Sequence, residues 1–158
     1  MFVINIPFDG LEVDARSPQL YVSGKTWITL DGYDFPANGW FDSPLSFLGS
    51  LRHAIARAAD GEDEADFYFW EGSYFVKLVP GPTHEGQRCV EIFAVDDGRA
   101  EDVFADGGSV EASCVCPLGE LARVFQGVVS ELTGWAQERR EVELLEFLAR
   151  ITDLPGLE

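Results

Sequence analysis

The stretch that decides the fold lies at residues 67–79 and reads FYFWEGSYFVKLV. Large apolar residues alternate on both sides of Glu71-Gly72, which indicates two antiparallel strands joined by a tight turn. A two-residue loop in this hairpin places Asp66 opposite Lys77, a favourable cross-strand pair. The same register puts five side chains on one apolar face: Phe67, Phe69, Tyr74, Val76 and Leu78.

Toward the amino end, the sequence predicts another hairpin at Asp9-Gly10. Asp-Gly pairs tolerate the positive φ angles of two-residue turns, and such a turn would pair residues 2–8 with residues 11–15. This register gathers the apolar side chains of both segments on one face. The next predicted features are strands over residues 20–22 and 27–30 and a turn at Asp31-Gly32.

Two further strands are predicted toward the carboxyl end, over residues 88–95 and 110–116. Alternation in the second strand puts four residues on one core-facing side: Val110, Ala112, Cys114 and Cys116.

Apolar residues at helical spacing occur in three segments. The first runs from Pro44 to about Ala59, and Asp42 or Ser43 is expected to cap it by accepting hydrogen bonds from the first turn. The second opens at Pro117, and a shorter one covers residues 142–151. Tight turns join antiparallel strands, and the helices come singly or last. We therefore expect the α+β class: one domain over residues 1–158, with a mainly antiparallel sheet and two or three helices packed on it.

The charge of the chain narrows the class of partner. There are 11 Lys and Arg residues against 28 Asp and Glu, a formal net charge of −17 in 158 residues. Such a chain repels nucleic-acid phosphate and anionic lipid, so neither nucleic acid nor a membrane is an expected partner. No apolar stretch is long enough to span a membrane, and the amino end lacks the features of a signal peptide. The chain has three cysteines, and an odd number cannot all pair within one chain. Together with the absence of signal-peptide features, this count predicts a cytoplasmic protein with reduced thiols.

The acidic residues gather in the middle third of the chain. Residues 60–113 hold 14 acidic residues against 3 basic ones, a net charge of −11. Much of it lies in two predicted loops, whose acidic residues are Asp60, Glu62, Asp63, Glu64 and Asp66 in the first and Asp96, Asp97, Glu101 and Asp102 in the second. The second loop does not have the spacing of an EF-hand calcium site. Solvated carboxylates are one interpretation, and docking of a basic protein surface is the other.

Aromatic residues offer candidate anchors for such a partner. In the predicted hairpin register, Tyr68, Trp70 and Phe75 lie on the face opposite the apolar one. Either a second layer covers this face or it is an exposed aromatic patch, and the overall pattern favours burial. If the face is exposed, Trp70 or Trp40 beside carboxylates would suit a protein interface.

Residues with catalytic or metal-binding chemistry give no convincing site. Cys114 and Cys116 could converge on a soft metal from one strand, with a third ligand from Cys89, His53 or His84. However, the same face carries core residues and no second ligand pair has zinc-site spacing, so buried free thiols are expected, with no metal or cofactor. Neither histidine stands in a nucleophile motif, and no glycine-rich phosphate loop is present. No catalytic residue is therefore assigned, and we do not expect an enzyme.

Two segments carry a resemblance to a known group of proteins. These are Phe35-Pro36-x-x-Gly39-Trp40-x-Asp42, followed by a helix, and the aromatic run 67–75. Over residues 30–80 the chain resembles small acidic bacterial proteins that are similar in size and charge to the immunity proteins of toxin–immunity systems. The resemblance implies a cytoplasmic protein that neutralises a cognate toxin by binding it. High usage of Gly, Ala and Arg with only two lysines suggests a GC-rich bacterial source, which is compatible.

Two classes of function remain from the sequence. The first is a binding protein whose acidic middle third meets a basic partner, such as a nuclease toxin domain that is basic because its substrate is phosphate. A general DNA mimic belongs to the same class, but carboxylates clustered in loops favour a dedicated partner. The second class is a small enzyme that uses carboxylates in a cleft, although no particular pair of carboxylates stands out.

Overall fold

The structure is a computed structural model that describes residues 1–16, 19–99 and 108–154. Within these ranges the chain forms three helices and ten strands. The helices are α1 (Pro44–Ala59), α2 (Leu118–Arg139) and α3 (Val142–Ile151). The strands are β1 (Phe2–Asn5), β2 (Glu12–Asp14), β3 (Tyr21–Lys25), β4 (Trp27–Leu30), β5 (Tyr33–Phe35), β6 (Phe41–Asp42), β7 (Ala65–Tyr68), β8 (Tyr74–Pro80), β9 (Cys89–Asp96) and β10 (Ser109–Pro117).

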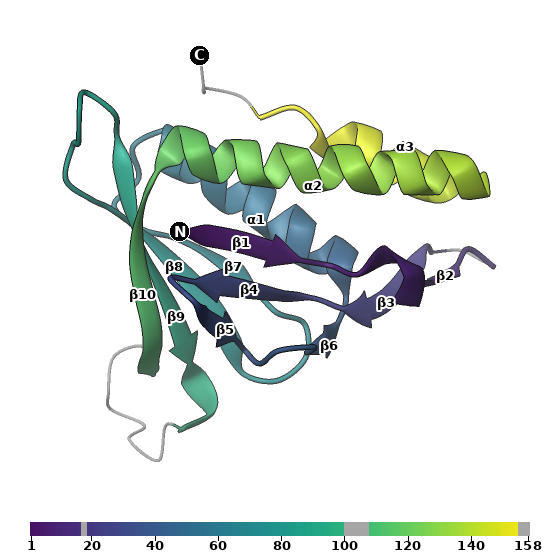
Figure 1. Cartoon of the computed structure of the whole chain (residues 1–158), viewed down its shortest axis with the longest axis horizontal. Coiled ribbons are helices and arrows are strands. Elements are labelled where there is room, and N and C mark those ends of the chain that lie inside the picture. The colour runs from purple at the N-terminus through teal and green to yellow at the C-terminus, as the bar shows by residue number, and fades with distance from the viewer. Residues whose placement is uncertain (17–18, 100–107, 155–158) are drawn as a thin grey trace.

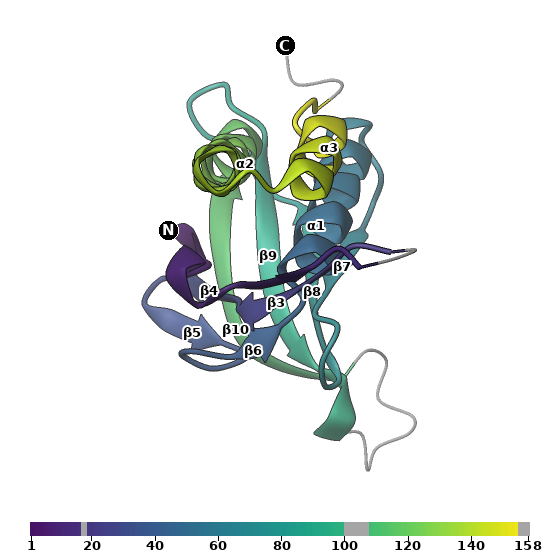
Figure 2. The same ribbon diagram turned by 90° about the vertical axis from the view of Figure 1, so that its right-hand side faces the viewer.

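The strands are arranged as three antiparallel sheets, with the helices gathered on one side of the molecule (Figure 1). The sheet orders are β10-β9-β8-β7, β1-β4-β5 and β2-β3-β6. Figure 2 shows α2 and α3 next to each other at the top, with α1 beneath α3 and beside the four-stranded sheet. Antiparallel sheets with segregated helices make an α+β fold, so the fold class predicted from the sequence is confirmed.

The hairpin of β7 and β8 has the predicted register. Asp66 lies opposite Lys77, and Tyr68 opposite Phe75. On the inward face, Phe67, Phe69, Val76 and Leu78 are all less than 5% exposed. This face packs on α1, where the ring of Phe47 lies 5.7 Å from that of Phe67. Two-residue alternation and burial thus agree over residues 65–69 and 76–78, whereas Tyr74, on the predicted apolar face, is half-buried like Phe75.

The hairpin predicted at Asp9-Gly10 is wrong. Residues Phe8–Gly10 form a short 3-10 helix, β1 pairs with β4, and β2 pairs with β3. Pairing with β4 packs Phe2 and Ile4 beside Leu30 and Ile28, and all four side chains are less than 8% exposed. Residues 11–15 offer only half-buried or exposed side chains, so the distant strand buries more apolar area.

The predicted turn at Asp31-Gly32 is confirmed. Leu30 pairs with Tyr33 across a two-residue loop, and both loop residues have positive φ, 46° at Asp31 and 87° at Gly32. Asp9 and Gly10 are not among the residues with positive φ. The same dipeptide therefore makes a hairpin turn at one position and part of a 3-10 helix at the other.

The predicted core face of β10 is correct only in part. Cys114 and Cys116 are buried, but Val110 is 57% exposed. A β-bulge between Val110 and Ala112 interrupts the alternation, which moves Val110 to the opposite face.

Candidate functional site

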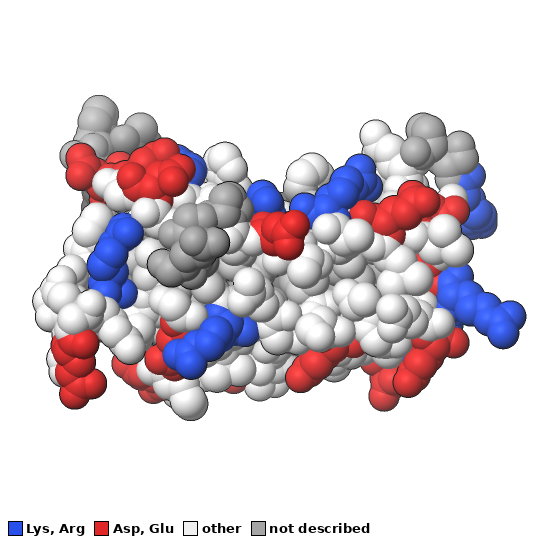
Figure 3. Space-filling model, turned by 90° about the horizontal axis from the view of Figure 1, so that it is seen from above, with Lys and Arg blue, Asp and Glu red and all other residues white. Residues whose placement is uncertain are grey.

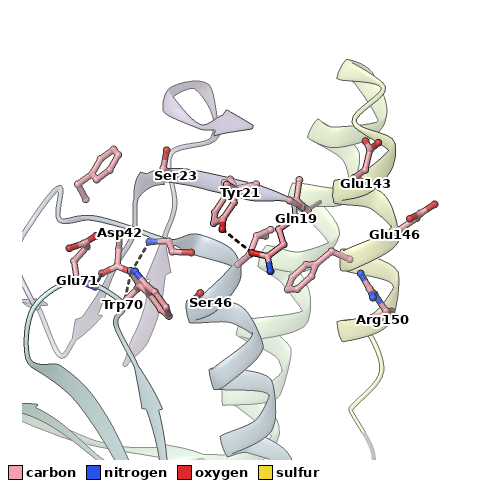
Figure 4. Close-up of a pocket in the computed structure, with 16 residues that line it drawn as sticks. Gln19, Tyr21, Ser23, Asp42, Ser46, Trp70, Glu71, Glu143, Glu146 and Arg150 are labelled. Carbon is pink, nitrogen blue, oxygen red and sulfur yellow. Dashed lines mark hydrogen bonds between the residues drawn. The ribbon is translucent and has the colours of Figure 1, made fainter. Parts of the chain in front are cut away.

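A groove of about 830 Å³ opens between β3, β6, the beginning of α1, the loop after β7, and α3 (Figure 4). We call it the Trp70 groove. Its lining consists of residues 19–23, 41–43, 45, 46, 70, 71, 143, 146, 147 and 150. These positions are spread over 132 residues of sequence, so the groove exists only in the folded chain.

Asp42 holds one end of the groove together. Its side chain belongs to a residue only 2% exposed, yet it accepts four hydrogen bonds. Oδ1 accepts from the backbone N–H groups of Ser43 (2.6 Å) and Trp70 (2.9 Å). Oδ2 accepts from the backbone N–H of Glu71 (3.1 Å) and from Nε1 of Trp40 (2.9 Å). The carboxylate therefore ties the loop after β7 to the beginning of α1.

This role differs from the helix cap predicted for Asp42 or Ser43. Ser43 is the N-cap residue of α1, but its side chain forms no capping bond in the described part of the chain. Two of the four hydrogen bonds that Asp42 accepts come from the loop residues Trp70 and Glu71, which lie 28 and 29 residues away in sequence. Because capping bonds are local and these are not, the spacing that indicated a cap could not reveal them.

The loop itself is built around Gly72. Its φ of 72° lies in the left-handed region, and a Cβ there would come within 2.7 Å of the Tyr74 ring. Glycine is therefore required for the chain to turn at this point. With Asp42 on the other side, the turn holds Trp70 at the mouth of the groove (Figure 4).

Three aromatic side chains at the groove are exposed. Trp70 is 72% exposed, Tyr21 62% and Phe41 58%. Burial of the aromatic face of the hairpin was therefore the wrong prediction for Trp70, and Tyr68 is also 54% exposed. Large aromatic residues gathered at an exposed hollow are typical of a protein interaction site.

Trp40, the other predicted anchor, lies in a different environment. It is half-buried, its ring stands edge-on to Tyr74 at 5.1 Å, and its Nε1 donates to Asp42. Trp40 thus supports the loop from within, while Trp70 is available at the surface.

Charged side chains stand at both ends of the groove. Glu71 lies beside Trp70 at one end, and α3 brings Glu143, Glu146 and Arg150 to the other (Figure 4). All four residues are exposed. Three carboxylates against one guanidinium make the rim acidic, which suits a basic ligand.

The first acidic loop, Asp60–Asp66, lies away from the groove. It joins the end of α1 to β7, at the end of the four-stranded sheet opposite to the Trp70 loop (Figure 1). Two of its carboxylates form ion pairs: Glu62 with Arg57 at 2.6 Å, and Glu64 with Lys77 at 3.0 Å.

The other three acidic residues of this loop differ among themselves. Asp60 and Asp63 are exposed, and neither forms an ion pair within the described residues. Asp66 is half-buried, and its Oδ1 has no hydrogen-bond partner among the residues that the structure describes. Although Asp66 lies opposite Lys77 as predicted, the Lys77 ammonium reaches Glu64 instead.

The second predicted acidic loop lies only partly in the described residues. Asp96 ends β9 and accepts hydrogen bonds from Gly98 N (3.0 Å) and Ser73 Oγ (3.3 Å). Asp97 is exposed, and its N–H donates to Ser73 O at 2.8 Å. Glu101 and Asp102 lie outside the described residues. Asp96 and Asp97 are therefore next to the Trp70 loop, at the end of the sheet away from Asp60–Asp66.

On the helix side, the acidic side chains of the described residues do not merge into one continuous face in Figure 3. Seen from above in Figure 3, acidic side chains lie in groups at both ends and along the edges, and the middle is largely uncharged with scattered Lys and Arg. Among the described residues, the Asp60–Asp66 loop and the Asp96–Asp97 pair lie at opposite ends of the four-stranded sheet.

The candidate metal ligands are the three cysteines and the two histidines. Cys89, Cys114 and Cys116 are free and buried, and burial raises the pKa of the Cys116 thiol to about 12. His53 and His84 are exposed. In the described part of the chain, no group of three or more His, Cys, Asp or Glu side chains is placed to hold a metal ion. None of the helices there is long and apolar enough to cross a membrane.

Sequence reasoning missed most residues of the groove. The sequence did not identify Tyr21, Phe41 or the α3 side chains as candidates. The pattern of each of their segments indicates a strand or a helix and no binding site. Tyr21 stands next to buried Val22, and Phe41 next to buried Asp42. An aromatic residue at an outward strand position was the one available signal.

Relationships to other proteins provide no separate guide to this groove. Searches against protein-family models, curated proteins and solved structures returned no match.

Proposed function

We propose that this chain is a binding protein that takes up a basic protein partner at the Trp70 groove. The observation that carries the proposal is the gathering of three exposed aromatic side chains, Tyr21, Phe41 and Trp70, around one acidic hollow. Aromatic anchors surrounded by charge are typical of the energetic centres of protein interfaces.

The loop that carries Trp70 is already positioned in the unbound protein. Two of the four hydrogen bonds that Asp42 accepts come from the backbone N–H groups of Trp70 and Glu71, and they hold the backbone of this loop in place before any partner arrives. An anchor that is already ordered loses less entropy on association, which strengthens binding. The acidic rim and the net charge of −17 attract a basic partner and speed its encounter.

Neutralisation of a bacterial toxin is the biological role that we propose for this binding. The immunity-protein resemblance supports it, and a basic nuclease-type toxin has the charge that the groove rim complements. A cytoplasmic location in the producing bacterium accords with three unpaired, buried cysteines.

The alternative of a carboxylate enzyme has less support. Asp42 is the buried carboxylate of the groove, and its two oxygens accept four hydrogen bonds. A carboxylate with its acceptor positions filled is poorly suited to act as a general base or nucleophile. The other carboxylates of the groove, those of Glu71, Glu143 and Glu146, are exposed to solvent rather than enclosed in a cleft.

The test is capture of the partner followed by measurement of its affinity for two matched variants. Trp70→Ala removes the proposed anchor, whereas Tyr68→Ala removes an exposed aromatic residue that does not line the groove. We expect a basic protein whose affinity falls about 30-fold or more with Trp70→Ala and less than about threefold with Tyr68→Ala.

Co-expression provides the biological readout. The wild-type chain should relieve growth inhibition by the captured protein, and Trp70→Ala should relieve it less. An acidic partner, or equal affinity of both variants, would contradict the proposal.

A further inference from the structure

One edge of β3 is left open by the way β6 ends. β3 pairs on one side with β2 over residues 21–23, and on the other side with β6 over residues 24–25 only. In the order β2-β3-β6, the β6 side of residues 21–23 has no strand partner in the described chain. If the register of β6 continued, Ser43 and Pro44 would lie opposite Ser23 and Val22, but α1 begins at Pro44.

This open edge borders the Trp70 groove. The lining includes Tyr21, Val22 and Ser23 on the β3 side and Leu45 and Ser46 on the α1 side. Figure 4 shows Tyr21 and Ser23 along β3, with Ser46 across from them on α1. Residues 21–23 therefore border the groove on the side where β3 has no strand partner in the described chain.

The open edge also lacks the usual protection of exposed strands. Natural proteins place charges, proline or bulges on such edges to prevent pairing with other chains. Residues 19–23 read QLYVS and contain none of these charges or prolines, in a chain of which 25% of the residues are charged. An unprotected edge beside an aromatic groove is suited to accept a strand.

We propose that the basic partner inserts an extended segment into the groove and adds it as a strand antiparallel to β3 along residues 21–23. This inference rests on the proposed function and specifies the form in which the partner binds. Backbone hydrogen bonds to β3 supply affinity, and alternate side chains supply specificity. Apolar side chains of the segment lie toward Val22 and Leu45, and basic side chains reach Glu71 at one end and Glu143 at the other.

A short acetylated peptide of alternating lysine and valine is the probe for this inference. In a strand, successive N–H groups point to opposite edges, so residues of one parity face β3 and the others face away. Two N-methylated isomers are compared with the parent peptide, one methylated at its valines and the other at its lysines. Both isomers keep the charge and the side chains, and each blocks one edge of the strand.

Strand addition predicts an unequal response of the two isomers. One should bind at least about tenfold more weakly than the parent peptide, and the other within about threefold. With the parent peptide, amide hydrogen exchange should slow only at those of residues 21–23 whose N–H groups face the open edge, and exchange at the paired residues 24–25 should not change. Trp70→Ala in the protein should weaken all three peptides together, because it alters the groove and not the pairing.

The outcomes separate this inference from the proposed function. Equal affinities of the two isomers, whether weakened or not, would overturn strand addition while leaving basic ligands in the groove. A helical lysine–leucine peptide that binds more tightly than the extended parent would overturn it as well. If the parent peptide does not bind, the inference fails, and capture with the Trp70→Ala control still decides the proposed function on its own.

Discussion

The Trp70 groove and the Asp60–Asp66 loop use carboxylates in opposite ways. In the groove, the one buried carboxylate, Asp42, accepts four hydrogen bonds and positions an exposed tryptophan. In the loop, five acidic residues lie within seven positions, but Glu62 and Glu64 are bound by Arg57 and Lys77 of the same chain. The density of acidic residues along a sequence therefore does not locate a binding site, because their partners decide what they do.

The largest effect that separates the two regions is expected for Asp42→Ala. It leaves three backbone N–H groups and the Trp40 indole without their acceptor, so we expect a loss of about 2–4 kcal/mol in the free energy of unfolding. Asp63→Ala in the acidic loop is the matched control, with an expected change within about 0.5 kcal/mol. Urea denaturation followed by circular dichroism measures both, and equal effects would mean that Asp42 does not hold the loop.

The next effect concerns association with the captured basic partner. The double variants Glu71→Lys with Glu143→Lys and Asp60→Lys with Asp63→Lys make the same change in net charge at the two regions. With a Debye length of about 8 Å at physiological ionic strength, charges near the interface dominate the encounter rate.

We therefore expect the groove pair to slow association about tenfold and the loop pair less than about threefold. Stopped-flow kinetics at several salt concentrations measures this difference, and the salt dependence should flatten mainly for the groove pair. A larger effect of the loop pair would move the interface to Asp60–Asp66.

A smaller effect is expected from the ion pair of Glu64 and Lys77. Their side chains are 62% and 29% exposed, so a double-mutant cycle with Glu64→Gln and Lys77→Met should give a coupling of about 0.2–1 kcal/mol. The hydrogen bond to Glu64 raises the pKa of Lys77 above its ordinary value of 10.5. This contribution is complete below pH 10.5 and is lost as the pH rises through the higher folded-state pKa. A coupling that persists unchanged at still higher pH would contradict this assignment.

The smallest effect is expected for the stability of Trp70→Ala. The side chain is 72% exposed, and the backbone N–H that donates to Asp42 remains, so the unfolding free energy should change by no more than about 0.5 kcal/mol. Thermal unfolding by calorimetry measures it. A clear destabilisation would show that Trp70 supports the fold, and its effect on binding would then have to be interpreted through folding.

Local patterns in the sequence predicted well those elements whose partners are close in the chain. The register of β7 with β8 follows from alternation around one short loop, and α1 spans the predicted residues because its apolar spacing and Pro44 are local signals. The two Asp-Gly dipeptides show that a local turn signal does not by itself determine which strands pair. At Asp31-Gly32 the two flanking strands, β4 and β5, pair with each other. At Asp9-Gly10 the preceding strand, β1, pairs instead with β4, which is more distant in sequence.

By itself, the sequence determined the α+β class, the acidic character of the chain, the main hairpin and the bounds of its first helix, because periodicity, charge and turn chemistry act over a few residues. Tertiary structure alone decided that β1 pairs with β4, that Asp42 is buried beneath the Trp70 loop, and that Trp70 itself is exposed. These outcomes depend on how much apolar area each long-range pairing buries and on which distant donors reach a buried carboxylate. The groove arises from the same long-range contacts, since its walls come from β3, β6, α1, α3 and the loop after β7.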